Sequence, residues 1–196
     1  MMNRLQQQLN FLYEIDKLKT ILRRSNLIAD TSRFENTAEH SWHLGLYAII
    51  LAEYSNAKID ISRVIKLVLL HDIVEIDAGD TFCYDDIHNE SKQEREQRAA
   101  DRIFGLLPDD QRDELMNLWK EFEERKTPEA KFAASVDRLQ PLLHNYVTGG
   151  GSWKRHGIKR HQVEARMQPI EEGSKQLFEL IQEILDDSVK KEILAG

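Results

Sequence analysis

Apolar residues in this chain recur every three or four positions rather than at every second one, and the 196 residues include only 9 glycines and 4 prolines. Such spacing places apolar side chains on one face of a helix, whereas a half-buried strand requires alternation. The sequence therefore predicts an all-α helical bundle, and it contains no convincing strand. The length suits one sizeable core rather than two. We expect a single domain over 1–196, with a core at about 12–146 and C-terminal helices at about 158–194 packed on it.

Several helix boundaries carry their own signals. Asp60 or Ser62 can cap one helix, and Thr127 followed by Pro128 is a typical helix start. Pro141 is expected to bend the helix that contains it. The expected helices span about 5–24, 37–54, 62–75, 90–102, 109–126 and 128–147, with one or two more after about 158.

Composition excludes some classes of function. A net charge of -7 and a pI near 5.5 argue against binding a nucleic acid polymer, which needs a basic surface. A small anionic ligand remains possible if a metal supplies positive charge. Cys83 is the one cysteine, so no internal disulfide can form. No apolar run approaches the roughly 20 residues that cross a bilayer, and the N-terminus lacks a signal-peptide pattern. We expect a cytoplasmic protein without membrane contact.

The dipeptide His71-Asp72 lies at the end of a strongly apolar stretch, directly after Val68 and two leucines. Ionisable side chains are costly in such a place unless something compensates them. An isolated His-Asp pair is most often a core histidine that pairs with its neighbour. A divalent cation would also compensate both side chains, because imidazole and carboxylate are common metal ligands.

Two further residues favour the metal interpretation. His40 lies near the start of the preceding apolar helix, and Asp137 interrupts the apolar middle of a later one. Three helices would thus each bring a ligand type to a buried place. Two imidazoles and two carboxylates suit Mn, Co, Fe, Zn or Ni better than Ca, and they leave coordination positions open for water and substrate.

Glu75 follows His71 by four residues, so both side chains are expected on one helix face. A carboxylate there could handle the proton of a water or of a leaving oxygen beside the metal. The alternative is a surface glutamate at a helix end.

The order of His40, His71-Asp72 and Asp137 resembles the HD-domain phosphohydrolase superfamily, and most of all its branch of 5'-deoxynucleotidases. The resemblance runs from about residue 12 to about residue 146. The matching segments are Leu18-Lys19 with Arg23, 35–41 (ENTAEHS), 71–75 (HDIVE), Gly79-Asp80 and Asp137-Arg138.

The resemblance implies an all-helical homodimer in which His40, His71, Asp72 and Asp137 hold one divalent transition metal. It further implies Glu75 as the catalytic acid or base. Arg23 would contact the phosphate, and the adjacent Arg24 is the alternative for this role. Asp80 would contact the substrate or a catalytic water.

Two segments depart from the branch. Residues 81–85 (TFCYD) lack the prolines associated with the nucleotidases, and 149–161 (GGGSWKRHGIKRH) is basic, aromatic and hinged by glycines. The second segment could close over an anionic substrate with Lys154, Arg155 or His156, or it could be a surface turn.

The remaining histidines are weaker candidates. His43 is expected in the core or behind the site, while His88, His144 and His161 look like partly exposed residues.

The sequence thus predicts a metal-dependent phosphohydrolase that removes the 5'-phosphate of (deoxy)nucleoside monophosphates. The alternatives are a phosphodiesterase or a nucleoside di- or triphosphate hydrolase with the same site, and a non-catalytic nucleotide-binding protein that retains a metal. Ile76 after Glu75 counts against the alarmone-hydrolysing branch, where a Glu-Asp pair is usual.

Overall fold

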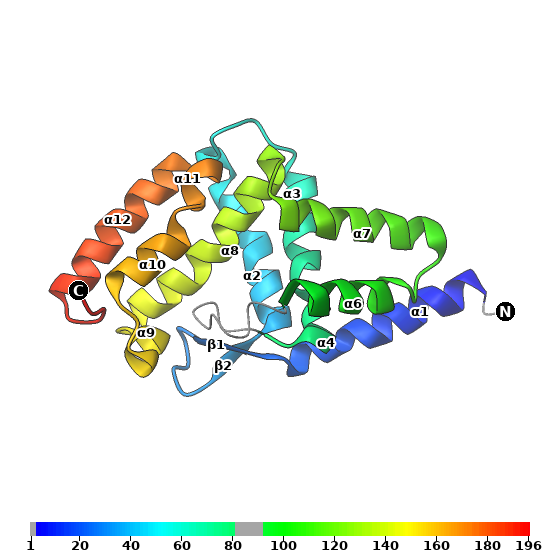
Figure 1. Cartoon of the computed structure of the whole chain (residues 1–196), viewed down its shortest axis with the longest axis horizontal. Coiled ribbons are helices and arrows are strands. Elements are labelled where there is room, and N and C mark those ends of the chain that lie inside the picture. The colour runs from blue at the N-terminus through cyan, green and yellow to red at the C-terminus, as the bar shows by residue number, and fades with distance from the viewer. Residues whose placement is uncertain (1–2, 81–91) are drawn as a thin grey trace.

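The computed structural model describes residues 3–80 and 92–196, and most of them are helical (Figure 1). The all-α expectation is confirmed. The helices are α1 (Arg4–Ile15), α2 (Thr37–Leu51), α3 (Ile61–Leu70), α4 (Glu75–Ala78), α6 (Lys92–Phe104), α7 (Asp109–Glu124), α8 (Pro128–Val147), α9 (Gly151–His156), α10 (Arg160–Met167), α11 (Ile170–Gly173) and α12 (Lys175–Lys190). Short 3-10 turns occupy η1 (Asp16–Thr20), η2 (Ala52–Tyr54) and η3 (His71–Val74), and two strands are β1 (Leu22–Asn26) and β2 (Phe34–Asn36).

The expected first helix over 5–24 is wrong in its second half. Helix α1 ends at Ile15, η1 follows, and the chain then extends into β1, which pairs antiparallel with β2. Of the expected helical stripe, Leu18 is buried, but Leu12 and Leu22 are 54% and 57% exposed, so the stripe is not buried along its whole length. Pairing with a segment about ten residues later decides this region, and local periodicity carries no information about that pairing.

Helix α8 lies at the centre of the molecule, with α2 and α3 on one side and the C-terminal helices on the other (Figure 1). Its Phe132 and Leu139 pack in one buried cluster with Leu44 of α2 and Leu67 of α3. A second buried cluster joins α1, α6 and α7 around residues such as Phe104. The two clusters together form the core, and the site lies where α2, α3 and α8 meet.

The expected helix starts are confirmed at both caps. Asp60 rather than Ser62 caps α3, since its Oδ1 accepts a hydrogen bond from the Ser62 amide at 2.9 Å. Thr127 Oγ1 accepts from the Ala130 amide at 3.2 Å, with Pro128 in the first turn. The helix that contains Pro141 continues through it to Val147.

The helix expected to reach Glu75 changes its hydrogen-bonding pattern on the way. Helix α3 ends at Leu70, and His71 begins the tighter turn η3 before the single turn of α4. Gly79 then takes a φ of 75°, a left-handed value that glycine adopts at little cost. Because of this change of pitch, the side chains of residues 71–80 point in other directions than they would in a regular helix.

The C-terminal helices pack on α8 at one end of the molecule. Gly173 of α11 permits the close approach, because a Cβ there would lie 2.5 Å from the Lys131 carbonyl oxygen of α8. Within the described ranges, no helix has the length and apolar character that crossing a bilayer requires.

Candidate metal centre

The N-terminus of α2 is built by a capping box. Asn36 Oδ1 accepts from the Glu39 amide at 2.9 Å, and Glu39 Oε2 accepts from the Asn36 amide at 3.0 Å. Both ends of the box satisfy amides that a helix start leaves without partners. The box fixes the first turn of α2, and this turn carries His40 into the protein interior, where it is fully buried.

The structure brings the four sequence-predicted ligands together. His40 Nε2 lies 3.1 Å from Asp137 Oδ1 and 3.8 Å from Asp72 Oδ2. His71 Nε2 lies 3.0 Å from Asp72 Oδ1 and 3.5 Å from Asp137 Oδ1. His40, His71 and Asp137 each offer a ligand atom, and these atoms lie within 4.8 Å of one another. The residues come from α2, η3 and α8, the arrangement that the sequence predicts.

The chemistry of His71 fits a cation. Its Nδ1 lies 2.9 Å from the Val68 carbonyl oxygen, which only accepts, so Nδ1 carries the proton. In the neutral ring Nε2 then presents a lone pair, and this buried atom makes no hydrogen bond to any residue in 3–80 or 92–196. Carboxylate oxygens of Asp72 and Asp137 face the same point. A neutral imidazole and two carboxylates around one point are the donor set of a first-row metal.

The charges of the centre agree with this fit. Burial acts to raise the pKa of Asp72 and Asp137. For Asp72, His71 and Arg23 outweigh burial and lower the pKa. For Asp137, His40 and His71 do the same. Burial acts to lower the pKa of His71, and the two carboxylates outweigh that effect and raise it. Two ionised carboxylates are thus concentrated in a buried place, which favours a divalent cation or a second proton on His71.

Glu75 lies beside this group in a buried position and lines the same cavity. Its Oε2 accepts a hydrogen bond from the Thr37 hydroxyl at 2.8 Å. Burial raises the pKa of Glu75 well above its ordinary value, and the neighbouring Asp72 adds to the effect while Arg23 opposes it. A carboxyl group in this state is suited to hold and donate a proton.

Strand β1 turns Arg23 inward and leaves Arg24 exposed. Arg23 Nη1 donates to Asp72 Oδ2 at 2.8 Å, and it lies 3.9 Å from Asp80 Oδ1. Arg23 Nε lies 3.7 Å from Glu35 Oε2 and has no hydrogen-bond partner among the described residues. Arg23 and Asp80 both line the cavity, and the Arg23 guanidinium brings positive charge to the carboxylates there.

These groups open onto a cavity of about 270 Å³. Its lining includes Arg23, Asp72, Glu75 and Asp137, and also Arg138 and residues of α9 and α10. The cavity mixes both signs of charge with a few apolar residues, which suits a small polar anion.

The structure does not bring Lys154 to this cavity. Lys154 is exposed and lines a separate hollow with Ile158 and the C-terminal residues. Arg155 of the same segment donates to Asn26 Oδ1 at 3.0 Å and lies over the Phe34 ring, so it ties α9 to the hairpin of β1 and β2. Arg155 of the basic segment thus packs against the hairpin and does not close over the cavity. Residues 81–85, which include Cys83, and His88 lie outside the described residues.

Sequence reasoning missed three buried polar residues near the centre. Glu35 and Gln140 lie beside His40, and Thr37 donates to Glu75. The expectation that His144 is partly exposed is wrong, since it is buried and within hydrogen-bonding distance of Gln140. A buried glutamine on the apolar stripe of α8 was the available signal, because such a side chain needs partners. His161 is exposed, as expected.

Several known proteins are similar to this chain in sequence or in fold. The sequence model of the HD domain family matches residues 15–178. A crystal structure described as a predicted metal-dependent phosphohydrolase from Magnetospirillum magnetotacticum is 52% identical, covers 98% of this chain and 96% of its own, and superposes with a TM-score of 0.94. Human 5'-deoxynucleotidase HDDC2 is 32% identical over 135 residues, which are 69% of this chain and 65% of that protein. The match thus spans slightly less than two thirds of the human protein.

The chain belongs to the HD domain family. The resemblance to this family and to its deoxynucleotidase branch, expected from the motifs, is confirmed.

Proposed function

We propose that this protein is a metal-dependent phosphomonoesterase that removes the 5'-phosphate of (deoxy)nucleoside monophosphates. The observation that carries the proposal is the convergence of His40, His71, Asp72 and Asp137 on one point, with the His71 Nε2 lone pair directed at it. The name 5'-deoxynucleotidase, which relatives 28–32% identical carry, supports the choice of substrate.

In this proposal the four residues hold one divalent cation, which is Mn, Co, Fe, Zn or Ni. When bound, such a cation polarises the phosphate oxygens and makes a water more acidic. The donor set and the burial of the group support one ion there, and supply decides among the candidate metals.

Each side chain around the cation has its own role in the reaction. Arg23, which lines the cavity, binds the phosphate through its guanidinium and offsets negative charge that moves during the reaction. As water bonds to phosphorus and the bond to the 5'-oxygen breaks, protonated Glu75 donates its proton to the leaving oxygen, so that the nucleoside leaves as an alcohol. The protons of the water remain with the inorganic phosphate, and one of them returns to Glu75. Asp80, at the cavity edge, accepts a hydrogen bond from a substrate hydroxyl or from a water. Lys154, in a separate hollow, has no part in this scheme.

We further propose a cytoplasmic homodimer of single-domain chains. An apolar stripe on α2 supports the dimer: Trp42, Leu46, Ile49 and Ile50 are spaced on one helix face, and Trp42 and Ile50 are 64% and 69% exposed. Such a stripe on a helix that is buried on its other side is typical of a protein interface.

The test is phosphate release from ribo- and deoxyribonucleoside 5'-monophosphates, cyclic nucleotides and triphosphates, with each candidate metal supplied in turn. We expect turnover of monophosphates, and none with Asp72→Ala under the same conditions. Cleavage confined to diesters or triphosphates would replace the proposed substrate class, and tight nucleotide binding without turnover would indicate a binding protein.

A further inference from the structure

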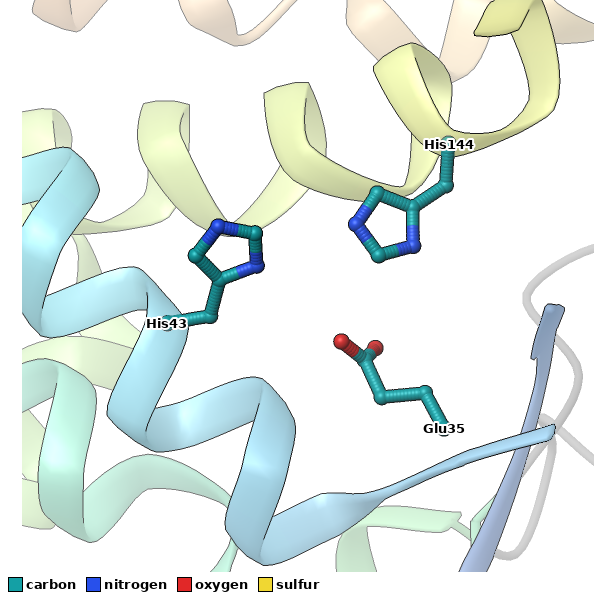
Figure 2. A group of neighbouring side chains, drawn as sticks. All are labelled: Glu35, His43 and His144. Atoms are coloured by element: carbon teal, nitrogen blue, oxygen red, sulfur yellow. The ribbon is translucent and has the colours of Figure 1, made fainter. Parts of the chain in front are cut away.

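A second group of ligand-type side chains lies behind the candidate centre. Glu35 of β2, His43 of α2 and His144 of α8 face a common point (Figure 2), and each offers an atom within 4.8 Å of the other two. Such a group can bind a cation. Whether it does here depends on what already lies between the three side chains.

The amide nitrogen of Gln140 lies between them. Gln140 Nε2 donates to Glu35 Oε1 at 2.6 Å and to His144 Nε2 at 3.0 Å, and it lies 3.5 Å from His43 Nδ1. His144 Nδ1 lies 3.1 Å from the Asn26 carbonyl oxygen, so this nitrogen carries the proton and Nε2 accepts. The point is therefore filled by an N–H donor that satisfies the acceptors around it, and the structure favours a hydrogen-bond network over a second cation.

This network fixes which end of the Gln140 amide faces His40. Because the nitrogen is held by two acceptors, the carbonyl oxygen points the other way and lies 3.2 Å from His40 Nδ1. A carbonyl oxygen only accepts, so His40 Nδ1 must carry the ring proton. Glu35 Oε2, 3.5 Å from the same nitrogen, favours that proton as well. In the neutral ring of a metal ligand, His40 Nε2 then has the lone pair, and Asp137 Oδ1, 3.1 Å away, would be another ligand atom of the same cation.

We propose that Gln140 is a positioning residue for metal binding, which sets the tautomer and ring orientation of His40 through an amide that Glu35 and His144 hold in one orientation. The inference rests on the proposed function, in that His40 is a ligand. A reversed amide would present N–H to His40 Nδ1, place the ring proton on Nε2 and block that ligand. Loss of the hydrogen bond from His40 to Gln140 thus lowers the affinity for the metal ion, although all four ligands remain.

The test measures Mn²⁺ binding by titration calorimetry and the visible absorption spectrum of the Co²⁺ form, neither of which requires turnover. Gln140→Met keeps the length of the side chain and removes both polar ends. Loss of a hydrogen-bond partner to a metal-bound histidine typically costs 10–100-fold in affinity. We expect Gln140→Met to raise the Mn²⁺ Kd by about that factor and to alter the Co²⁺ spectrum.

Ser135→Ala is the matched control. Ser135 is a buried polar residue on the same helix, and its hydroxyl donates to the carbonyl oxygens of Lys131 at 2.8 Å and Ile170 at 3.3 Å rather than to a ligand. Its variant is expected to bind Mn²⁺ as the wild type does. If Gln140→Met does not fold, His144→Phe is the second variant, since it removes one of the two acceptors that hold the amide nitrogen and should also raise the Kd.

Three results distinguish failure of this inference from failure of the proposed function. An unchanged Kd in a folded Gln140→Met or His144→Phe, with a wild type that binds Mn²⁺ and releases phosphate, overturns the inference and leaves the proposed function standing. A wild type that binds no Mn²⁺ overturns both. If His43→Phe loses one bound ion relative to the wild type, the second group holds a cation and Gln140 does not fill that point.

Discussion

Replacing Arg23 with methionine tests how the candidate centre balances its charge. Arg23 is 13% exposed at its side chain, donates to Asp72 at 2.8 Å, and lies 3.7 Å and 3.9 Å from oxygens of Glu35 and Asp80. Arg23→Met leaves these carboxylates without their shared cation. Breaking a buried pair by removing one partner costs about 3–5 kcal/mol, in line with roughly 4 kcal/mol for unit charges 4 Å apart at an effective dielectric constant of 20.

For a chain of this length 1 kcal/mol corresponds to roughly 2–4 °C in Tm. We therefore expect Arg23→Met to lower the Tm of the metal-free protein by about 10 °C. A bound divalent cation neutralises Asp72 in place of the guanidinium, so the loss should fall below about 5 °C when metal is saturating. Calorimetric melting with a chelator and with excess Mn²⁺ measures both values.

Arg24→Met is the control, because Arg24 is adjacent and exposed. Its effect on the free energy of unfolding should stay within about 0.5 kcal/mol. An equal loss of Tm for Arg23→Met with and without metal would refute the reasoning, since the metal and Arg23 would then not share the charge of Asp72.

Three other predictions concern turnover, metal retention and assembly. Glu75→Gln should lower kcat by about 10²–10⁴-fold with metal content unchanged. Because the raised pKa of Glu75 keeps its proton to higher pH, wild-type kcat should fall as pH rises through that pKa. The pH profile of the variant should lack this decline. Asp137→Ala should purify without bound metal, whereas retention at the wild-type ratio by elemental analysis would exclude Asp137 as a ligand. Ile50→Glu should sediment as a monomer with its helix content intact, and an unchanged sedimentation coefficient would place the interface elsewhere.

The sequence predicted most of the helices, and it predicted which ionisable residues would lie close together, because both follow from local signals. Caps at Asp60 and Thr127 are readable within a few residues, and ionisable residues such as His71 and Asp137 stand out in apolar stretches. Burial makes such residues costly unless they are compensated, so their convergence could be expected before the fold was known.

The features that were missed depend on contacts between distant segments. The β1–β2 pairing overrides the helical periodicity of 5–24, and it is this pairing that separates Arg23 from Arg24. The partners of His40 come from β2 and α8, so neither Glu35 nor Gln140 could be connected to it from spacing. Lys154 was expected near the substrate from composition alone, and the orientation of α9 places it elsewhere.

The most direct measurement of the central claim is anomalous diffraction from crystals of the Mn²⁺-loaded protein. We predict one anomalous peak at roughly 2.0–2.3 Å from His40 Nε2, His71 Nε2 and a carboxylate oxygen each of Asp72 and Asp137, the range of distances for first-row metal ligands. Density without a peak at that point, or a peak held only by other residues, would contradict the account.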